Sequence, residues 1–345
     1  MSSSSKVSRL CGNYGSENFN EMRQKYKEMI STLPNRMPYH PIYKLYQYEG
    51  FWYYSSFLEA ALCMQQNFNP QPSDIFLCTA PKSGTTWLKA LTFSIITRHD
   101  FHDDFTNSPL VNKGVHACIP YLEHDFLNKP KFVDRVGLSL LATHLPYTIL
   151  PKSISLNNCK IIYIYREPKD AFVSSWHFTH KIEAKNLEVP LITLDQALKW
   201  FCQGKSVFGP YWDHVLGYWK ASVEKPDRVF FFKYEDLKED TLGYVKKLAE
   251  FMDKPFSKEE QERGVPQEIV ARCNFENLSN LEVNKSGMLL SERTLQISNS
   301  VFYRKGEVGD WKNYLTDDMA KLIDDITHDK FQSSGLTFPS SSACN

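Results

Sequence analysis

The chain has 345 residues, of which 42% are hydrophobic and 14% are aromatic, enough for a substantial core. Because it has no internal repeat and no Pro/Gly/Ser-rich linker, it is expected to form one large domain. Forty basic residues balance forty acidic residues, so no overall field would attract nucleic acid or an anionic membrane, and any anion site must be local. The eight cysteines lack metal-binding spacing, which predicts a protein without a metal site. No run of about eighteen apolar residues occurs, and no apolar segment follows the serine-rich start, so a cytoplasmic location is expected.

The N-terminal residues are mostly polar and lack a sustained hydrophobic period. This predicts a mobile tail over residues 1–26, followed by a folded domain over residues 27–340. Four adjacent aromatic residues, Phe51–Tyr54, precede a helical pattern over Ser56–Gln66. The aromatic cluster is interpreted equally well as a core contact or as the wall of a substrate pocket.

Three strand–loop–helix units follow along the chain. In the first, Ile75–Thr79 is typical of a strand buried on both faces, and a polar loop leads into a helical pattern over Trp87–Arg98. The second has a strand at Lys160–Tyr165 and a helix from about Lys169, and the third has a strand at Val229–Phe232 before further helices. Alternating strands and helices predict an α/β fold with a central, mostly parallel sheet flanked by helices, and ligands at the carboxyl ends of the strands.

The loop after the first strand, Pro81–Thr86, has the features of an anion cradle. Its glycine permits tight backbone geometry, and successive amides and the helix N-terminus can surround an anion beside Lys82. A nucleotide triphosphatase loop needs G-x-x-x-x-G-K-[ST], whereas here the lysine precedes the single glycine, Gly84. The loop is therefore P-loop-like but favours a phosphate or sulfate ester handled without metal, and a helix cap with an incidental lysine is the simpler alternative. The three hydroxyl donors are Ser83, Thr85 and Thr86.

Three segments together carry a resemblance to a known family. Thr79–Trp87 resembles the 5'-phosphosulfate loop of cytosolic sulfotransferases, Tyr165–Phe178 resembles their 3'-phosphate segment, and Arg304–Lys312 resembles their C-terminal nucleotide-binding motif. The segments occur in the expected order, and the chain between them is most similar to plant members. The chain is identified as a member of this family, whose enzymes transfer the sulfuryl group of 3'-phosphoadenosine 5'-phosphosulfate (PAPS) to a small hydroxyl acceptor and release 3'-phosphoadenosine 5'-phosphate (PAP).

The resemblance implies a set of PAPS-binding residues. Lys82 is expected beside the oxygen that bridges sulfur and the 5'-phosphate, where negative charge develops during transfer. The Arg166 guanidinium is expected to hold the 3'-phosphate, and Trp87 and Phe275 are expected to sandwich the adenine. The other implied donor-site residues are Ser83, Gly84, Thr85, Thr86, Ser174, Tyr234, Arg304, Lys305 and Gly306.

The general base implied by the resemblance is His144, which follows the apolar run Leu138–Ala142 in a T-H-L-P segment that matches the catalytic histidine of the family. A neutral imidazole can accept the acceptor's hydroxyl proton near pH 7. Animal members often have a lysine two positions earlier, where this chain has Ala142, so a second cationic contact on the sulfuryl oxygens is missing from that position. The chemistry is expected to survive, because Lys82 and His144 remain.

The acceptor is expected to be a small molecule in an apolar cavity, with a phenol or flavonoid as the first expectation. Steroids, hydroxylated fatty-acid hormones and desulfoglucosinolates stay open, because plant-like members collectively accept them. The segment from Lys312 departs from the dimerisation signature of many animal relatives, which predicts a monomer or a weak homodimer. The predicted cavity residues are Phe51, Trp52, Tyr147, Phe178 and Phe208.

Residues 274–299, with Gly287 and several polar side chains, are predicted to act as a lid that orders when ligand binds. Two other functions stay open. A small-molecule kinase with a P-loop would require magnesium, and a PAPS or PAP sensor would bind nucleotide without turnover.

Overall fold

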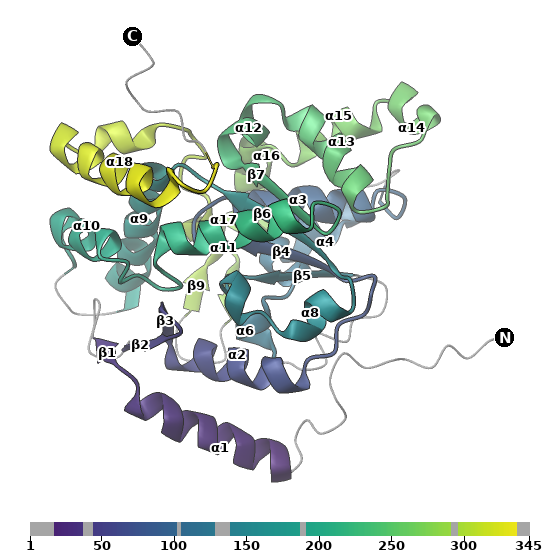
Figure 1. The fold of residues 1–345 in the computed structure, drawn as a ribbon. Coiled ribbons are helices and arrows are strands. Elements are labelled where there is room, and N and C mark those ends of the chain that lie inside the picture. Colours follow the sequence, from purple (N-terminus) through teal and green to yellow (C-terminus); the bar gives the residue numbers. More distant parts are fainter. Residues whose placement is uncertain are drawn as a thin grey trace.

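A four-stranded parallel sheet forms the centre of the fold (Figure 1). The computed structural model of the protein describes residues 17–36, 44–101, 105–127, 139–186, 191–290 and 296–336. Across the sheet the strand order is β5-β4-β6-β7, and each neighbouring pair is parallel. The strands are β4 (Ile75–Thr79), β5 (Leu140–Thr143), β6 (Lys160–Tyr165) and β7 (Val229–Lys233). The predicted α/β fold with a parallel sheet is confirmed.

Helices cover both faces of this sheet, which explains why its strands are apolar without alternation. Phe76 and Tyr163 belong to the core on one face, and Leu77 and Ile162 belong to the core on the other. The main covering helices are α2 (Ser55–Asn67) and α11 (Tyr211–Glu224) on the first face, and α3 (Thr85–Ile96) and α13 (Thr241–Phe251) on the second.

The carboxyl ends of the four strands meet at one edge of the sheet. There β4 continues into the glycine loop and α3, β6 continues into α9 (Pro168–Asn186), and β7 continues into α12 (Tyr234–Glu239). His144 directly follows β5 and Arg166 directly follows β6. The topology therefore gathers three of the predicted site segments at this edge.

The N-terminal helix α1 (Glu17–Thr32) begins ahead of the predicted domain boundary, which falls inside it. It packs on α2 (Figure 1), where Arg23 Nε lies 2.6 Å from the Glu59 carboxylate. Phe19 and Ile30 are buried in the main core. Met22, Tyr26 and Met29 pack against the same core, so an apolar face with helical spacing runs along a helix that is otherwise polar. Residues 1–16 lie outside the described residues.

Smaller elements complete the fold. The aromatic segment Phe51–Tyr54 forms β3, which pairs antiparallel with β2 (Leu45–Tyr48), and β2 pairs with β1 (Asn35–Arg36). A second hairpin joins β8 (Met288–Leu290) to β9 (Gln296–Ser298). The remaining helices are η1 (Phe105–Asn107), α4 (Pro109–Lys113), α5 (Val115–Cys118), α6 (Leu122–Asp125), η2 (Tyr147–Ile149), α8 (Lys152–Leu156), α10 (Leu194–Cys202), α14 (Lys258–Glu262), α15 (Val265–Arg272), α16 (Phe275–Asn280), α17 (Glu282–Lys285), η3 (Asn299–Phe302), η4 (Asp310–Asn313) and α18 (Asp317–Phe331).

The described residues contain neither a membrane-spanning helix nor a cluster of metal-binding side chains. None of their helices combines the length and the apolar character needed to cross a membrane. Within the same ranges, no group of three or more His, Cys, Asp or Glu side chains is arranged to hold a metal ion.

The packing of α1 leads to a test of stability. Replacing Phe19 by Ala should lower the free energy of unfolding by about 3 kcal/mol, because it removes a buried aromatic side chain from the core. Replacing the exposed Lys25 of the same helix by Ala should change it by less than about 0.5 kcal/mol. Urea denaturation measures both, and equal, small effects would show that α1 is not part of the cooperative domain.

Candidate active site

The loop after β4 is shaped by two residues with positive φ. Lys82 has φ 66° and Gly84 has φ 111°, and α3 begins at the next residue. A Cβ atom on Gly84 would lie 2.7 Å from the Tyr234 ring, so a larger residue would displace that ring. Glycine is therefore required both for the backbone conformation and for the contact. The resulting turn presents its amides and the N-terminus of α3 to one space.

The Lys82 ammonium faces aromatic rings and lacks a nearby carboxylate among the ion pairs of the described chain. It lies 4.1 Å from the centre of the Phe178 ring and 5.9 Å from that of Phe302. Burial, together with the charges of Arg166 and Arg304, lowers the pKa of Lys82 to about 7. A bound anion would raise this pKa again, so the site is electrostatically suited to a negative ligand.

The third motif brings two further cations to the same edge. The Asp310 carboxylate, which is buried, pairs with Arg304 at 2.5 Å and with Lys305 at 2.6 Å. Although burial raises the pKa of Asp310, hydrogen bonds from Lys305, Asn313 and Arg304 lower it to about 2. Asp310 therefore holds the two cations in place as a permanent anion.

A second carboxylate joins the third motif to helix α9. Asp170 accepts hydrogen bonds from the backbone amides of Gly309 (2.7 Å) and Trp311 (3.0 Å). Arg166 donates to the Glu307 carbonyl at 2.6 Å and lies 3.6 Å from Asp170. Segments about 140 residues apart in the chain thus form one basic cluster.

Several donors at this edge have no acceptor among the described residues. The buried atoms are Ser83 Oγ, Trp87 Nε1, Arg166 Nε and Arg304 Nε. Buried donors are almost always paired in folded proteins, so a concentration of unpaired ones at a basic cluster indicates an anionic ligand with several acceptor oxygens. These residues fit the phosphate groups of a nucleotide.

Tyr234 connects the residues predicted to hold the adenine. Its ring lies 5.7 Å from that of Trp87, and its hydroxyl donates to the Gly306 carbonyl at 3.3 Å. A Cβ atom on Gly306 would come within 2.5 Å of the Phe275 ring, so the glycine lets that ring approach the backbone. Ser174 is buried on α9, one helical turn beyond Asp170.

The ring of His144 is oriented by the end of the neighbouring strand β4. Its Nδ1 lies 2.8 Å from the Thr79 carbonyl oxygen and 3.0 Å from Thr79 Oγ1. Because a carbonyl oxygen only accepts hydrogen bonds, Nδ1 carries the proton in the neutral ring. Nε2 then keeps its lone pair, which is the form that a general base requires.

The backbone of His144 is held from two sides. Its amide donates to Glu123 on α6 at 2.7 Å, and its carbonyl accepts from His214 Nε2 on α11 at 2.9 Å. His214 in turn accepts from the Tyr163 hydroxyl at 2.8 Å, a buried contact. Sequence analysis did not single out His214 or Glu123, and no motif marks them, because they act through contacts between distant segments.

Burial controls the protonation of this region. It lowers the pKa of His144 to about 3, and the charge of Lys89 acts in the same direction, while the hydrogen bond to Thr79 opposes it. Burial raises the pKa of Glu123 to about 7. The His144 imidazole is therefore neutral across the physiological pH range.

Five aromatic rings form a closed circuit beside the base. Phe208, a predicted cavity residue, lies 5.7 Å from His144 and stacks on Phe57 at 5.5 Å. From Phe57 the circuit passes to His124 at 4.5 Å and then to Tyr121 at 5.7 Å. Tyr121 returns to His144 at 5.0 Å. The rings pack against one another and give the protein an aromatic surface beside His144.

The other predicted cavity residues take different positions. Phe51 and Trp52 are buried in β3, and the Trp52 carbonyl accepts from the Phe208 amide at 2.7 Å, which supports the Phe208 loop. Phe178 lies against Lys82. Tyr147 does not join the circuit, since its ring packs on Tyr218 at 5.5 Å.

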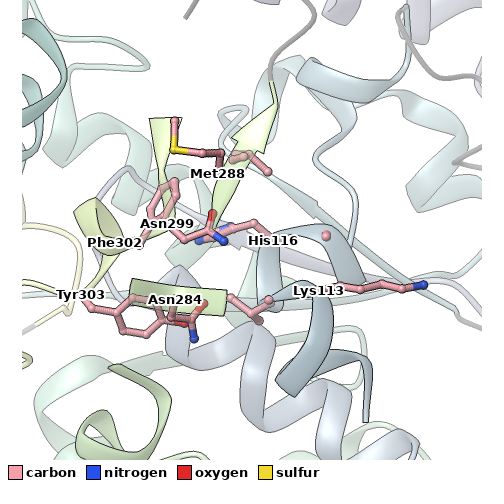
Figure 2. Close-up of a pocket in the computed structure, with 11 residues that line it drawn as sticks. Lys113, His116, Asn284, Met288, Asn299, Phe302 and Tyr303 are labelled. Carbon is pink, nitrogen blue, oxygen red and sulfur yellow. The ribbon is translucent and has the colours of Figure 1, made fainter. Parts of the chain in front are cut away.

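A cavity next to the glycine loop lies between α5 and the segment predicted as a lid (Figure 2). His116 borders it, with Nε2 3.2 Å from Thr86 Oγ1 and its ring 4.1 Å from that of Phe302. Figure 2 shows that Asn284 from α17 and Asn299 from η3 also line the cavity. The lid itself stays a prediction, and residues 291–295 of that segment lie outside the described residues.

Comparison with known proteins decides the family. Residues 72–335 match the sulfotransferase domain model. The chain belongs to the sulfotransferase family. The resemblance noted in the sequence is confirmed, including its similarity to plant members.

Two curated plant relatives of this sulfotransferase are similar over almost their whole length. The Arabidopsis thaliana protein named cytosolic sulfotransferase 17 is 44% identical over 321 residues, 92% of this chain and 91% of the relative. Flavonol 3-sulfotransferase of Flaveria bidentis is 47% identical over 313 residues, 90% of this chain and 99% of the relative.

Two solved structures are also similar. A proposed steroid sulphotransferase from Arabidopsis thaliana has a TM-score of 0.71 and 34% identity, and the match covers 93% of this chain and 97% of that one. A mouse sulfotransferase complexed with PAP has a TM-score of 0.61 and 27% identity, with 84% and 96% covered. Both matches support the single-domain α/β architecture of this sulfotransferase.

The buried His214 makes stability depend on pH. Burial lowers its pKa to about 4, so as pH falls below the ordinary histidine value the unfolded chain takes up a proton that the folded protein does not. This group alone should make the protein about 2 kcal/mol less stable at pH 5 than at pH 8. In His214→Gln, that difference should shrink by about 2 kcal/mol, as measured by urea denaturation at the two pH values. His328→Gln, at an exposed position, is the control and should leave it unchanged.

Proposed function

We propose that the protein transfers the sulfuryl group of PAPS to a hydroxyl of a small aromatic acceptor, with His144 as the general base. The observation that carries the proposal is the neutral His144 ring, whose Nδ1 is bound to the Thr79 carbonyl and whose Nε2 is left to accept a proton. The same Thr79 ends the strand that leads into the Lys82 loop. The base and the anion site are thus supported by one strand end.

PAPS would be held by the three motifs. The loop with Lys82 suits the 5'-phosphosulfate, because it supplies the N-terminus of α3, the unpaired Ser83 hydroxyl and the Lys82 ammonium group. The unpaired Nε atoms of Arg166 and Arg304 suit the 3'-phosphate, with Ser174 and Lys305 as further donors. Trp87, Tyr234 and Phe275 offer flat surfaces to the adenine.

The chemical step follows from these positions. His144 Nε2 takes the proton of the acceptor hydroxyl as the acceptor oxygen bonds to sulfur, and the bond between sulfur and the 5'-phosphate oxygen breaks. The Lys82 ammonium stabilises the negative charge that collects on that leaving oxygen. The Thr79 carbonyl keeps its hydrogen bond when the ring becomes imidazolium, which stabilises the charged base. The products are the sulfated acceptor and PAP.

The acceptor class is supported by the aromatic circuit and by the relatives. Rings from Phe57, Tyr121 and Phe208 suit a flat phenol or flavonoid, and a flavonol sulfotransferase is among the similar proteins. We expect the protein to act in the cytoplasm, since several relatives are named cytosolic, and as a monomer or weak homodimer.

Activity on an acceptor panel tests the proposal. PAPS is mixed with flavonols, simple phenols, steroids, hydroxylated fatty acids or desulfoglucosinolates, without metal, and PAP release is measured. Release should be fastest with a flavonol or phenol, and His144→Ala should slow it by about 100-fold or more, because the proton acceptor is removed. PAP affinity should be unchanged in that variant. Tight PAP binding without release with any acceptor would instead indicate a nucleotide sensor.

The nucleotide site has its own test. Arg304→Met should weaken PAP binding by about 30-fold, equivalent to about 2 kcal/mol, because it removes charge-assisted donors to the 3'-phosphate. Isothermal titration calorimetry measures the change. Lys258→Met, which removes a charge that is 92% exposed and distant in the chain from the motifs, is the control and should bind PAP normally. Equal PAP affinities for both variants would show that Arg304 does not bind the nucleotide.

A further inference from the structure

One lysine side chain lies entirely inside the protein behind the active site. Lys89, on α3, is 0% exposed. Its ammonium donates to the Ile119 carbonyl at 3.0 Å and lies 3.4 Å from the centre of the Tyr121 ring. Burying an ammonium group is costly unless nearby charges and dipoles balance it. A buried lysine next to a catalytic site therefore requires an explanation.

Two carboxyl groups of α6 provide the balance. Both Asp125 and Glu123 attract the Lys89 charge. Asp125 accepts from the Tyr121 amide at 2.9 Å, and Glu123 accepts from the His144 amide at 2.7 Å. Each acid is thus attached to the backbone of a residue at the active site. The Lys89 ammonium group attracts both carboxylates and so helps to hold them at these two backbone amides.

The Tyr121 ring forms a second connection. The Tyr121 ring contacts the Lys89 ammonium group, and its centre lies 5.0 Å from that of the His144 ring. A cation on an aromatic face restrains both partners when water is excluded. Lys89 therefore reaches His144 by two routes, through Tyr121 and through Glu123.

We propose that Lys89 is a positioning residue for the sulfuryl transfer: its buried ammonium group holds the Tyr121 ring and the Glu123 carboxylate around His144. This proposal rests on the proposed role of His144 as the base.

The groups that face His144 show in which direction Lys89 shifts the pKa of the His144 ring. They are Thr79 from β4, Glu123 and His124 from α6, His214 from α11 and Lys89 from α3. Burial already lowers the pKa of His144, and the Lys89 charge lowers it further. Burial lowers the pKa of Lys89 to about 7, against the attraction of Asp125 and Glu123, so its ammonium group is charged mainly below neutral pH. Removing that charge should raise the pKa of His144 only in part, because burial, the larger cause of the shift, remains.

The test is the pH dependence of kcat/KM for the acceptor at saturating PAPS. At pH 6, kcat/KM of Lys89→Met should be about 10-fold below that of the unmodified protein, whereas at pH 8.5, where the Lys89 ammonium group is largely deprotonated, the two should differ by less than about 3-fold. PAP affinity should not change. Lys89→Arg, which stays charged, should keep the activity of the unmodified protein at pH 6, and Lys89→Gln is available if Lys89→Met does not fold.

A matched control separates positioning from packing. Thr92→Val alters a buried residue of the same helix without changing a charge, so it should lower stability and leave the pH profile as it is in the unmodified protein. Ring signals of His144 in a pH titration by NMR provide a readout that does not need activity. If His144→Ala keeps full activity, the proposed function fails. If His144 is required but the profile and titration of Lys89→Met match those of the unmodified protein, the positioning role of Lys89 is wrong.

Discussion

The hydrogen bond from the His144 ring to the Thr79 carbonyl is the contact on which the active site depends. It joins the ends of two adjacent parallel strands, β5 and β4, and selects the ring tautomer that leaves Nε2 as an acceptor. The Thr79 hydroxyl also forms a hydrogen bond with the hydroxyl of Thr85, at the start of α3. One strand end therefore orients the base and the first turn of the anion-binding helix together.

The second constraint is the concentration of positive charge in a chain with no net charge. Burial lowers the pKa of Lys82, and the nearby charges of Arg166 and Arg304 lower it further. Asp170 and Asp310 hold these cations and their backbone in place through hydrogen bonds. Such a preorganised cluster can bind a multiply charged ligand without rearranging, because the cost of assembling the cations is met during folding.

Several functional features could be predicted from sequence because their signals are local. The strand before Lys82 and the strand before Arg166 have the predicted bounds, since each is a short, wholly apolar run that ends at polar residues. The helix α1 was missed because its apolar face, which includes Phe19, Met22 and Tyr26, is sparse within a mostly polar segment. Its place in the domain depends on packing against α2.

By itself, the sequence determined the family, the order of the strand–loop–helix units and the residue types that can bind an anion, because motifs and hydrophobic runs are properties of neighbouring residues. Only the tertiary structure decided that His214 and Glu123 hold the backbone of His144, and that Tyr121 and Lys89 lie behind it. These residues come from different helices and have no shared spacing. Their proximity follows from strand order and from burial, which also set the protonation of the base.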